Sequence, residues 1–130
     1  MLYRKIASKI ESFLKSEKKR MLVVSGARQV GKSYIIREVG MRLYSNFIEV
    51  NMEEDKQSNR LFENARTVED FMIALSTIAG AKMKDSEKTL VFIDEIQAYS
   101  HLLTLAKFLV EDGRFTYIAS GSQLGIALKT

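Results

Sequence analysis

Residues 26–33 combine the residue types that bind a phosphate chain. They read Gly-Ala-Arg-Gln-Val-Gly-Lys-Ser and fit the pattern G-x-x-x-x-G-K-[ST] without a mismatch. Gly26 and Gly31 permit backbone angles and a close approach that a Cβ atom would forbid, and successive amide N–H groups then converge on an oxyanion. Lys32 supplies a mobile positive charge for the β- and γ-phosphates, and the Ser33 hydroxyl supplies an oxygen ligand for Mg²⁺. The pattern predicts a phosphate-binding loop (P-loop); an ordinary tight turn before a helix is the alternative.

The segments on either side of this loop fit the same prediction. Met21 to Ser25 is a short apolar run rich in β-branched residues, as in a buried strand. Ile35, Ile36, Val39 and Leu43 follow at helical spacing. A helix that begins at the loop points its unpaired N–H groups and its positive dipole end at the phosphates. The loop thus has the strand before it and the helix after it that phosphate binding requires.

Asp94 and Glu95 form a pair of carboxylates at the end of the apolar run 90–93, about 60 residues beyond Ser33. In a doubly wound sheet, ligands bind at the carboxyl ends of the strands. Asp94 is therefore predicted to hold Mg²⁺ together with Ser33, directly or through water. Glu95 is predicted to point toward the γ-phosphate and to polarise an attacking water. The alternative is that both carboxylates only cap the next helix.

A water-activating glutamate favours hydrolysis over phosphoryl transfer, because a small-molecule kinase does not need one and excludes water. The acidic pair therefore favours an ATPase with an additional strand between the P-loop strand and the acidic strand. The run 115–119 is predicted to be that strand, and it ends at Ser120-Gly121-Ser122. We expect Ser122 or Ser120 to contact the γ-phosphate or the attacking water; a turn of small residues is the alternative.

The predicted nucleotide site is assembled from these segments. Lys32 and Glu95 are its expected catalytic residues, and Ser33 and Asp94 are its expected Mg²⁺ ligands. The residues expected to contact the nucleotide are Gly26, Ala27, Arg28, Gln29, Val30, Gly31, Lys32, Ser33, Tyr34, Ser120 and Ser122.

Strands alternate with helices along the chain. Strands are predicted at about residues 21–25, 47–51, 90–94 and 115–120. Helices are predicted over residues 2–15, after the P-loop, from Thr67 to Gly80, and around residues 102–109. The polar segments 51–60 and 81–89 are predicted to be loops or surface turns. The alternation predicts an α/β fold of three layers, of the P-loop NTPase type, with a mainly parallel sheet covered on both faces.

Composition excludes several other classes of protein. The chain has 130 residues, of which 46% are apolar and 28% charged, as in an ordinary soluble globular domain. It has no cysteine and one histidine, which excludes disulfides, thiolate metal sites and histidine-rich metal sites. Its apolar runs are far shorter than the roughly 20 residues of a membrane span, and residues 1–10 lack the apolar core of a secretory signal. We expect no membrane association and a cytoplasmic location.

The formal net charge is +4, and much of the positive excess lies in the first twenty residues. These basic residues form a solvated helix face, or they bind an anionic partner such as nucleic acid. Aromatic residues are not interleaved with them, which disfavours a stacking platform for single-stranded nucleic acid.

The strings at residues 26–33, 34–38, 91–97 and 119–128 together resemble the AAA-like P-loop ATPase domain of a broad prokaryotic family. GARQVGKS and DEIQ are the most specific of them, and the resemblance spans nearly the whole chain. It implies that the chain binds ATP with Mg²⁺ and hydrolyses it. It assigns phosphate binding to residues 26–33, Mg²⁺ to Ser33 and Asp94, water activation to Glu95, and γ-phosphate sensing to residues 120–122. The lack of a guanine-recognition string N-K-x-D also favours ATP over GTP.

The resemblance further implies a fifth strand, additional helices and a C-terminal region beyond this point in family members. We therefore expect residues 1–130 to be one ATPase domain, the N-terminal part of a longer protein, with the last strand missing. The strand at residues 21–25 would then be an exposed apolar edge, open to self-association or to a protein partner.

Two other functions fit the same motifs. One is a nucleotide-gated interaction module, in which ATP binding drives docking of a partner and hydrolysis is slow or absent. The other is a phosphotransferase, which Glu95 disfavours. Gln97, just beyond the acidic pair, is a candidate link between the nucleotide state and the following helix. Spacing does not identify an arginine that acts on a neighbouring subunit among Arg37, Arg42, Arg60, Arg66 and Arg114.

Overall fold

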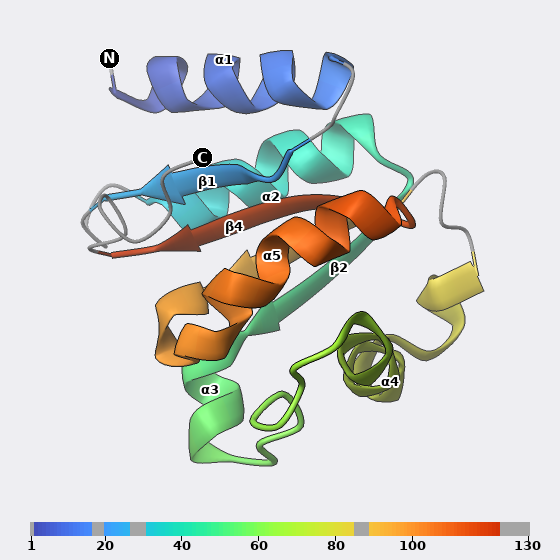
Figure 1. The fold of residues 1–130 in the computed structure, drawn as a ribbon. Helices are drawn as coiled ribbons and strands as arrows, with labels where there is room; N and C mark the ends of the chain where they lie inside the picture. Colours follow the sequence, from blue (N-terminus) through green and yellow to red (C-terminus); the bar gives the residue numbers. More distant parts are fainter. Residues whose placement is uncertain (1, 17–19, 27–30, 85–88, 123–130) are drawn as a thin grey trace.

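Four parallel strands form the centre of the computed structural model, which describes residues 2–16, 20–26, 31–84 and 89–122 (Figure 1). The strands are β1 (Leu22–Ser25), β2 (Asn46–Asn51), β3 (Thr89–Asp94) and β4 (Thr116–Gly121). Their order in the sheet is β1-β4-β3-β2, and every neighbouring pair is parallel. Strand β4 therefore lies between β1 and β3, which confirms the predicted additional-strand arrangement.

Helices cover both faces of the sheet. Helices α1 (Leu2–Lys15) and α2 (Lys32–Leu43) pack on one face, and α4 (Val68–Ala79) and α5 (Ser100–Asp112) pack on the other. Along β3, Leu90 and Phe92 are buried with α1 and α2, whereas Val91 and Ile93 are buried with α4 and α5. Every residue of β3 is buried as a result, and the three-layer α/β fold predicted from the sequence is confirmed.

The polar segment after β2 forms a helix, which corrects the loop predicted at residues 51–60. Helix α3 (Met52–Gln57) begins where the Asn51 side chain accepts a hydrogen bond from the Glu54 backbone N–H, at 3.0 Å. Three acidic residues in its first turn complement the positive end of the helix dipole. This segment is polar because it is a short surface helix beside a pocket, not because it is irregular.

The remaining elements differ from the prediction mainly at their ends. Helix α4 begins after Thr67, whose Oγ1 accepts a hydrogen bond from the Asp70 N–H at 3.1 Å, and it ends at Gly80, as predicted. The loop predicted at residues 81–89 contains most of a short 3₁₀ helix, η2 (Gly80–Lys84), and β3 begins at Thr89. A second 3₁₀ helix, η4 (Ile96–Ala98), lies between β3 and α5.

Asp55 holds α3 against the segment between β3 and α5. Its buried carboxylate accepts hydrogen bonds from the backbone N–H groups of Leu61 and Phe62, each at 3.0 Å, and from the Tyr99 hydroxyl at 2.8 Å. Burial, and then the hydrogen bond to Asp55, raise the pKa of Tyr99 above its usual value, so the hydroxyl stays a donor. The Lys56 ammonium also donates to the Ala98 carbonyl at 3.0 Å. Side chains of α3 and of Tyr99, the residue after η4, thus join α3 to η4.

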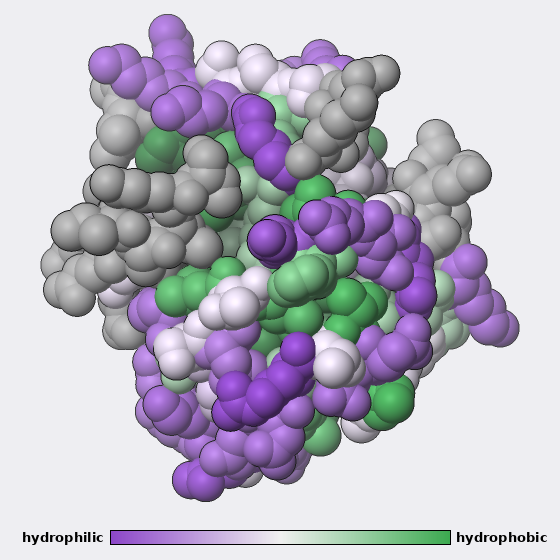
Figure 2. All heavy atoms as spheres, in the orientation of Figure 1, coloured by the Kyte–Doolittle hydropathy of each residue, from purple (hydrophilic) through white to green (hydrophobic). Residues whose placement is uncertain are grey.

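The face of the molecule drawn in Figure 2 is largely hydrophilic where it is coloured. Figure 2 shows mainly hydrophilic side chains over α1 and around α3, with hydrophobic residues in the middle of that face. No helix within the described ranges is long and apolar enough to cross a membrane. Strand β1 lies at one edge of the described sheet, with Leu22 and Val23 half-buried and Val24 buried. It therefore occupies the edge position that the sequence predicts.

At Gly40, α2 packs closely on side chains of the sheet, which generates a stability prediction. A Cβ atom there would lie 2.8 Å from Leu90 Cδ2 and 2.9 Å from Phe47 Cε1, both on buried side chains. Alanine is usually preferred to glycine in a helix by about 1 kcal/mol, whereas overpacking a core typically costs about 1–3 kcal/mol. We expect Gly40→Ala to lower the free energy of unfolding by about 1 kcal/mol, measured by urea denaturation.

Met41 provides the control on the same helix, because its side chain is 57% exposed. We expect Met41→Ala to change the free energy of unfolding by less than about 0.5 kcal/mol. A Gly40→Ala variant as stable as the parent chain would contradict the tight packing of α2 on β2 and β3.

Candidate functional site

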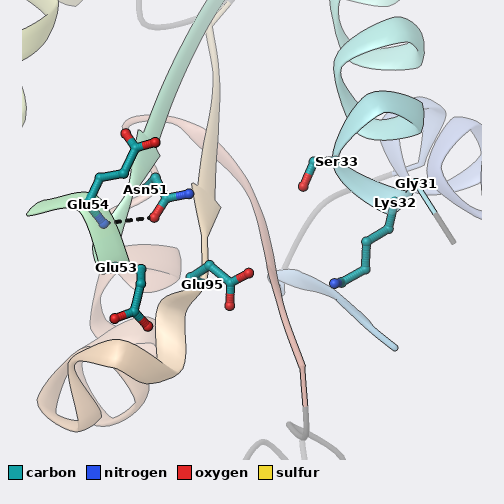
Figure 3. A pocket seen from close by; sticks show the side chains of 7 residues that line it. All are labelled: Gly31, Lys32, Ser33, Asn51, Glu53, Glu54 and Glu95. Atoms are coloured by element: carbon teal, nitrogen blue, oxygen red, sulfur yellow. Dashed lines mark hydrogen bonds between the residues drawn. The ribbon is translucent and has the colours of Figure 1, made fainter. Parts of the chain in front are cut away.

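A pocket of about 310 Å³ lies between the N-terminus of α2 and the start of α3 (Figure 3). Gly31, Lys32 and Ser33 line it on the α2 side. Among the described residues, Asn51, Glu53, Glu54 and Glu95 also line it. Because all four strands are parallel, their carboxyl ends meet at this edge of the sheet, where ligands of such folds bind.

The two glycines that bracket the predicted P-loop adopt positive φ angles. Gly26, directly after β1, has φ 151°, and Gly31, directly before α2, has φ 67°. A Cβ atom at Gly31 would meet nothing within 4 Å, so its backbone angle rather than lack of space favours glycine. Gly31 also holds the N-cap position, and as a glycine it has no side chain that could accept from the first N–H groups of α2. The N–H groups of such a helix start can bind an anionic ligand. The predicted ligands Ala27, Arg28, Gln29 and Val30 lie outside the described residues.

Asp94 is the point at which three elements of the site meet. Its Oδ2 accepts a hydrogen bond from Ser33 Oγ of α2 at 2.9 Å. Its Oδ1 accepts hydrogen bonds from Ser120 Oγ of β4 at 2.6 Å and from the Glu95 backbone N–H at 2.9 Å. The side chain is only 5% exposed. The structure therefore brings together Ser33, Asp94 and Ser120, which the sequence predicted to share one site.

The two serines at the end of β4 lie in different environments. Ser120 is fully buried against Asp94, while Ser122 is half-buried, and no hydrogen bond joins it to Asp94 in the part of the chain that the structure describes. Tyr34, also predicted to contact the nucleotide, is 61% exposed and does not line the pocket. Of these three predicted ligands, Ser120 forms a hydrogen bond with the acidic pair, to Asp94.

Glu95 points in a different direction from Asp94 although the two are adjacent. It has φ 51° and ψ 47°, a left-handed conformation that is uncommon outside glycine. Figure 3 shows its carboxylate directed across the pocket toward the Lys32 side chain. Gln97 Nε2 donates a hydrogen bond to Glu95 Oε1 at 2.8 Å. One carboxylate thus faces the Ser33 hydroxyl while the other faces the space where a ligand would sit.

Lys32 places a positive charge on the opposite side of the pocket. It is the first residue of α2 and is only 3% exposed. Within the described ranges, no carboxylate lies within ion-pairing distance of its ammonium. A buried ammonium is costly without a counter-ion, so this position favours an anionic ligand.

Arg37 contributes a second positive charge one turn beyond Ser33. Its guanidinium forms a two-point ion pair with Glu49 of β2, with N–O distances of 2.7 and 2.8 Å. The hydrogen bonds to Glu49, and more weakly the charge of Asp94, raise the pKa of Arg37. Arg37 is one of the arginines considered for action on a neighbouring subunit, and its guanidinium is engaged within its own chain.

Oxygen ligands for a hard cation are present on the α2 side of the pocket. Ser33 Oγ and Asp94 Oδ2 lie 2.9 Å apart, and oxygen is the donor that Mg²⁺ prefers. Where the structure describes the chain, no group of three or more histidine or acidic side chains is arranged to hold a metal ion. A hydroxyl and a carboxylate nevertheless fit Mg²⁺, because this ion usually keeps several waters.

Sequence reasoning missed the pocket wall opposite the P-loop. Asn51, Glu53 and Glu54 were assigned to a loop without a role, yet all three line the pocket. The signal was available, because Asn51 ends β2 and pairs in register with Asp94 at the end of β3. Polar residues at the carboxyl ends of adjacent parallel strands lie at the same edge of the sheet.

Comparison with known proteins agrees with this geometry. No curated protein sequence matches the chain. A family model described as an AAA domain matches residues 18–130, which include the P-loop, the acidic pair and all four strands. The chain therefore belongs to the AAA domain family, as the resemblance of its motifs predicted.

Proposed function

We propose that this chain binds ATP together with Mg²⁺ and hydrolyses it. The observation that carries the proposal is the pocket in which the buried Lys32 ammonium and the Ser33–Asp94 pair face the Glu95 carboxylate. Membership of the AAA domain family supports nucleotide binding. A cation, a pair of oxygen ligands and a directed carboxylate are the groups that hydrolysis of a nucleoside triphosphate needs.

Binding is assigned to the start of α2. The N–H groups of its first turn and of the P-loop donate hydrogen bonds to the phosphate oxygens, and Lys32 neutralises charge on the β- and γ-phosphates. Ser33 and Asp94 are the proposed protein ligands of Mg²⁺, which would neutralise phosphate charge when bound. Ser120 holds the Asp94 carboxylate from the β4 side, so Asp94 has little freedom to turn away.

The proposed reaction is an in-line attack of water on the γ-phosphorus. Glu95 accepts a proton from this water as the new O–P bond forms. The bond between the γ-phosphorus and the β,γ-bridging oxygen breaks, which releases ADP with that oxygen, and Glu95 returns its proton to solvent or phosphate. The proposal rests on the direction of the Glu95 carboxylate, because it faces the Lys32 side of the pocket rather than the sheet.

A nucleotide-gated interaction module is the second candidate function. The observation that favours it is the link from the pocket wall at α3, through Asp55 and Tyr99, to the start of α5. Such a link allows nucleotide occupancy to alter a distant surface without turnover. The substitution of Glu95 described below separates the two functions, because only hydrolysis requires that carboxylate.

Removing the Lys32 ammonium should abolish most of the nucleotide affinity. We expect Lys32→Ala to weaken binding of ATP with Mg²⁺ at least about 100-fold, a loss of about 2.7 kcal/mol, because the buried charge that faces the phosphates is gone. Isothermal titration calorimetry with Mg²⁺ and with a chelator measures this loss and the metal dependence together. Lys107→Ala, at an exposed position on α5, should bind as the parent does. Parental affinity in the Lys32→Ala variant would reject the proposed site.

Glu95→Gln should separate binding from turnover. We expect ATP affinity within about threefold of the parent and a kcat lower by about 100-fold or more, because the amide cannot accept the proton. Phosphate release under multiple-turnover conditions measures kcat. Glu54→Gln is the matched control, since this glutamate also lines the pocket but is exposed, and it should keep parental turnover. Hydrolysis by Glu95→Gln at the parental rate would remove the water-activating role.

The two serines at the end of β4 give a paired stability test. We expect Ser120→Ala to lower the free energy of unfolding by about 2 kcal/mol, because a hydrogen bond to a buried carboxylate is lost. We expect Ser122→Ala to change it by less than about 0.5 kcal/mol. Urea denaturation of both variants measures the difference, and equal effects at the two positions would contradict the special position of Ser120.

A further inference from the structure

The Gln97 side chain forms one well-formed hydrogen bond, and its amide oxygen has no hydrogen-bond partner among the described residues. Its Nε2 donates to Glu95 Oε1 at 2.8 Å. Its Oε1 is buried and has no hydrogen-bond partner within the described ranges. The amide cannot be turned around to change this, because its oxygen would then face the oxygen of the Glu95 carboxylate.

A buried acceptor without a partner is rare in native structures and calls for a reason. Methionine has nearly the same length and would fill this space without an unpaired oxygen. Stability of the fold therefore does not explain a glutamine at this position. The donor that it offers to Glu95 does, because Glu95 already occupies a strained left-handed conformation and its carboxylate must be held in one direction.

We propose that Gln97 is a positioning residue that holds the Glu95 carboxylate toward the nucleotide pocket. This inference rests on the proposed function and names how its water-activating group is kept in place. A proton acceptor works only when it is held within hydrogen-bond reach of the reacting water, so a small misplacement is costly. The Gln97 amide restrains the carboxylate through its Oε1 atom.

The anchoring of η4 explains how Gln97 itself is held. The residue after η4, Tyr99, donates its hydroxyl to Asp55 of α3, and Lys56 of α3 donates to the Ala98 carbonyl. The same α3 supplies Glu53 and Glu54 to the opposite wall of the pocket. The direction of Glu95 is therefore tied, through Gln97 and η4, to the wall that a bound ligand would touch.

Two substitutions of similar size, one to an apolar and one to a charged side chain, test this role. Gln97→Met removes the donor and the unpaired oxygen, and Gln97→Glu replaces the donor with a second carboxylate. We expect both to lower kcat for ATP about 10- to 100-fold while ATP affinity stays within about threefold of the parent. We expect the thermal unfolding midpoint of Gln97→Met to equal or exceed that of the parent. Gln57→Met, at an exposed position at the end of α3, is the control and should leave kcat unchanged.

A double variant distinguishes positioning from a general structural effect. In the Glu95→Gln background, adding Gln97→Met should change the residual single-turnover rate by less than about twofold, because residues that act as a unit are not additive. A parental kcat in Gln97→Met and Gln97→Glu, or an equal loss in both backgrounds, would overturn the inference while Glu95 keeps its role. Parental turnover in Glu95→Gln, or no turnover by the parent chain, would reject the proposed function and this inference with it.

Discussion

The site depends on one buried carboxylate that accepts hydrogen bonds from three directions. Asp94 receives the Ser33 hydroxyl from α2, the Ser120 hydroxyl from β4 and the Glu95 N–H from its own chain. Burying an ionised group without such partners is strongly unfavourable, so the fold must supply all of them. The donors come from α2, from β4 and from the residue after β3, so one carboxylate joins α2 and β4 to the end of β3.

The second constraint is that two adjacent carboxylates, those of Asp94 and Glu95, must point in different directions. In a continuing strand, Asp94 and Glu95 would point to opposite faces, and Glu95 would enter the core beneath α4 and α5. The left-handed conformation at Glu95 ends the strand and directs its side chain into the pocket instead. The turn of η4 that follows brings Gln97 back to Glu95, and the contacts between Asp55 and Tyr99 fasten this turn to α3.

Short apolar runs that alternate with helical stripes along the chain made most of the architecture predictable, and the limits of the prediction have specific causes. In a continuing strand, Ser120 and Ser122 would point to the same side of the sheet. They differ because β4 ends at Gly121, and the exact end of a strand cannot be predicted from the sequence. Tyr34 follows Ser33 by one residue. Successive residues of a helix point about 100° apart, so Tyr34 points away from Asp94, which could have been predicted from the sequence. Helix α3 was missed because its cap and acidic first turn look like loop composition.

The charges of the described residues bear on how the proposed nucleotide would be held. Among these residues, the pocket lining includes three carboxylates, Glu53, Glu54 and Glu95, and one ammonium, that of Lys32. The guanidinium of Arg37 is already paired with Glu49. Repulsion between these carboxylates and a phosphate chain is weakly screened at short range in a partly buried site. Under the proposed function, the backbone N–H groups at the start of α2 and a divalent cation at Ser33 and Asp94 would offset this acidic wall.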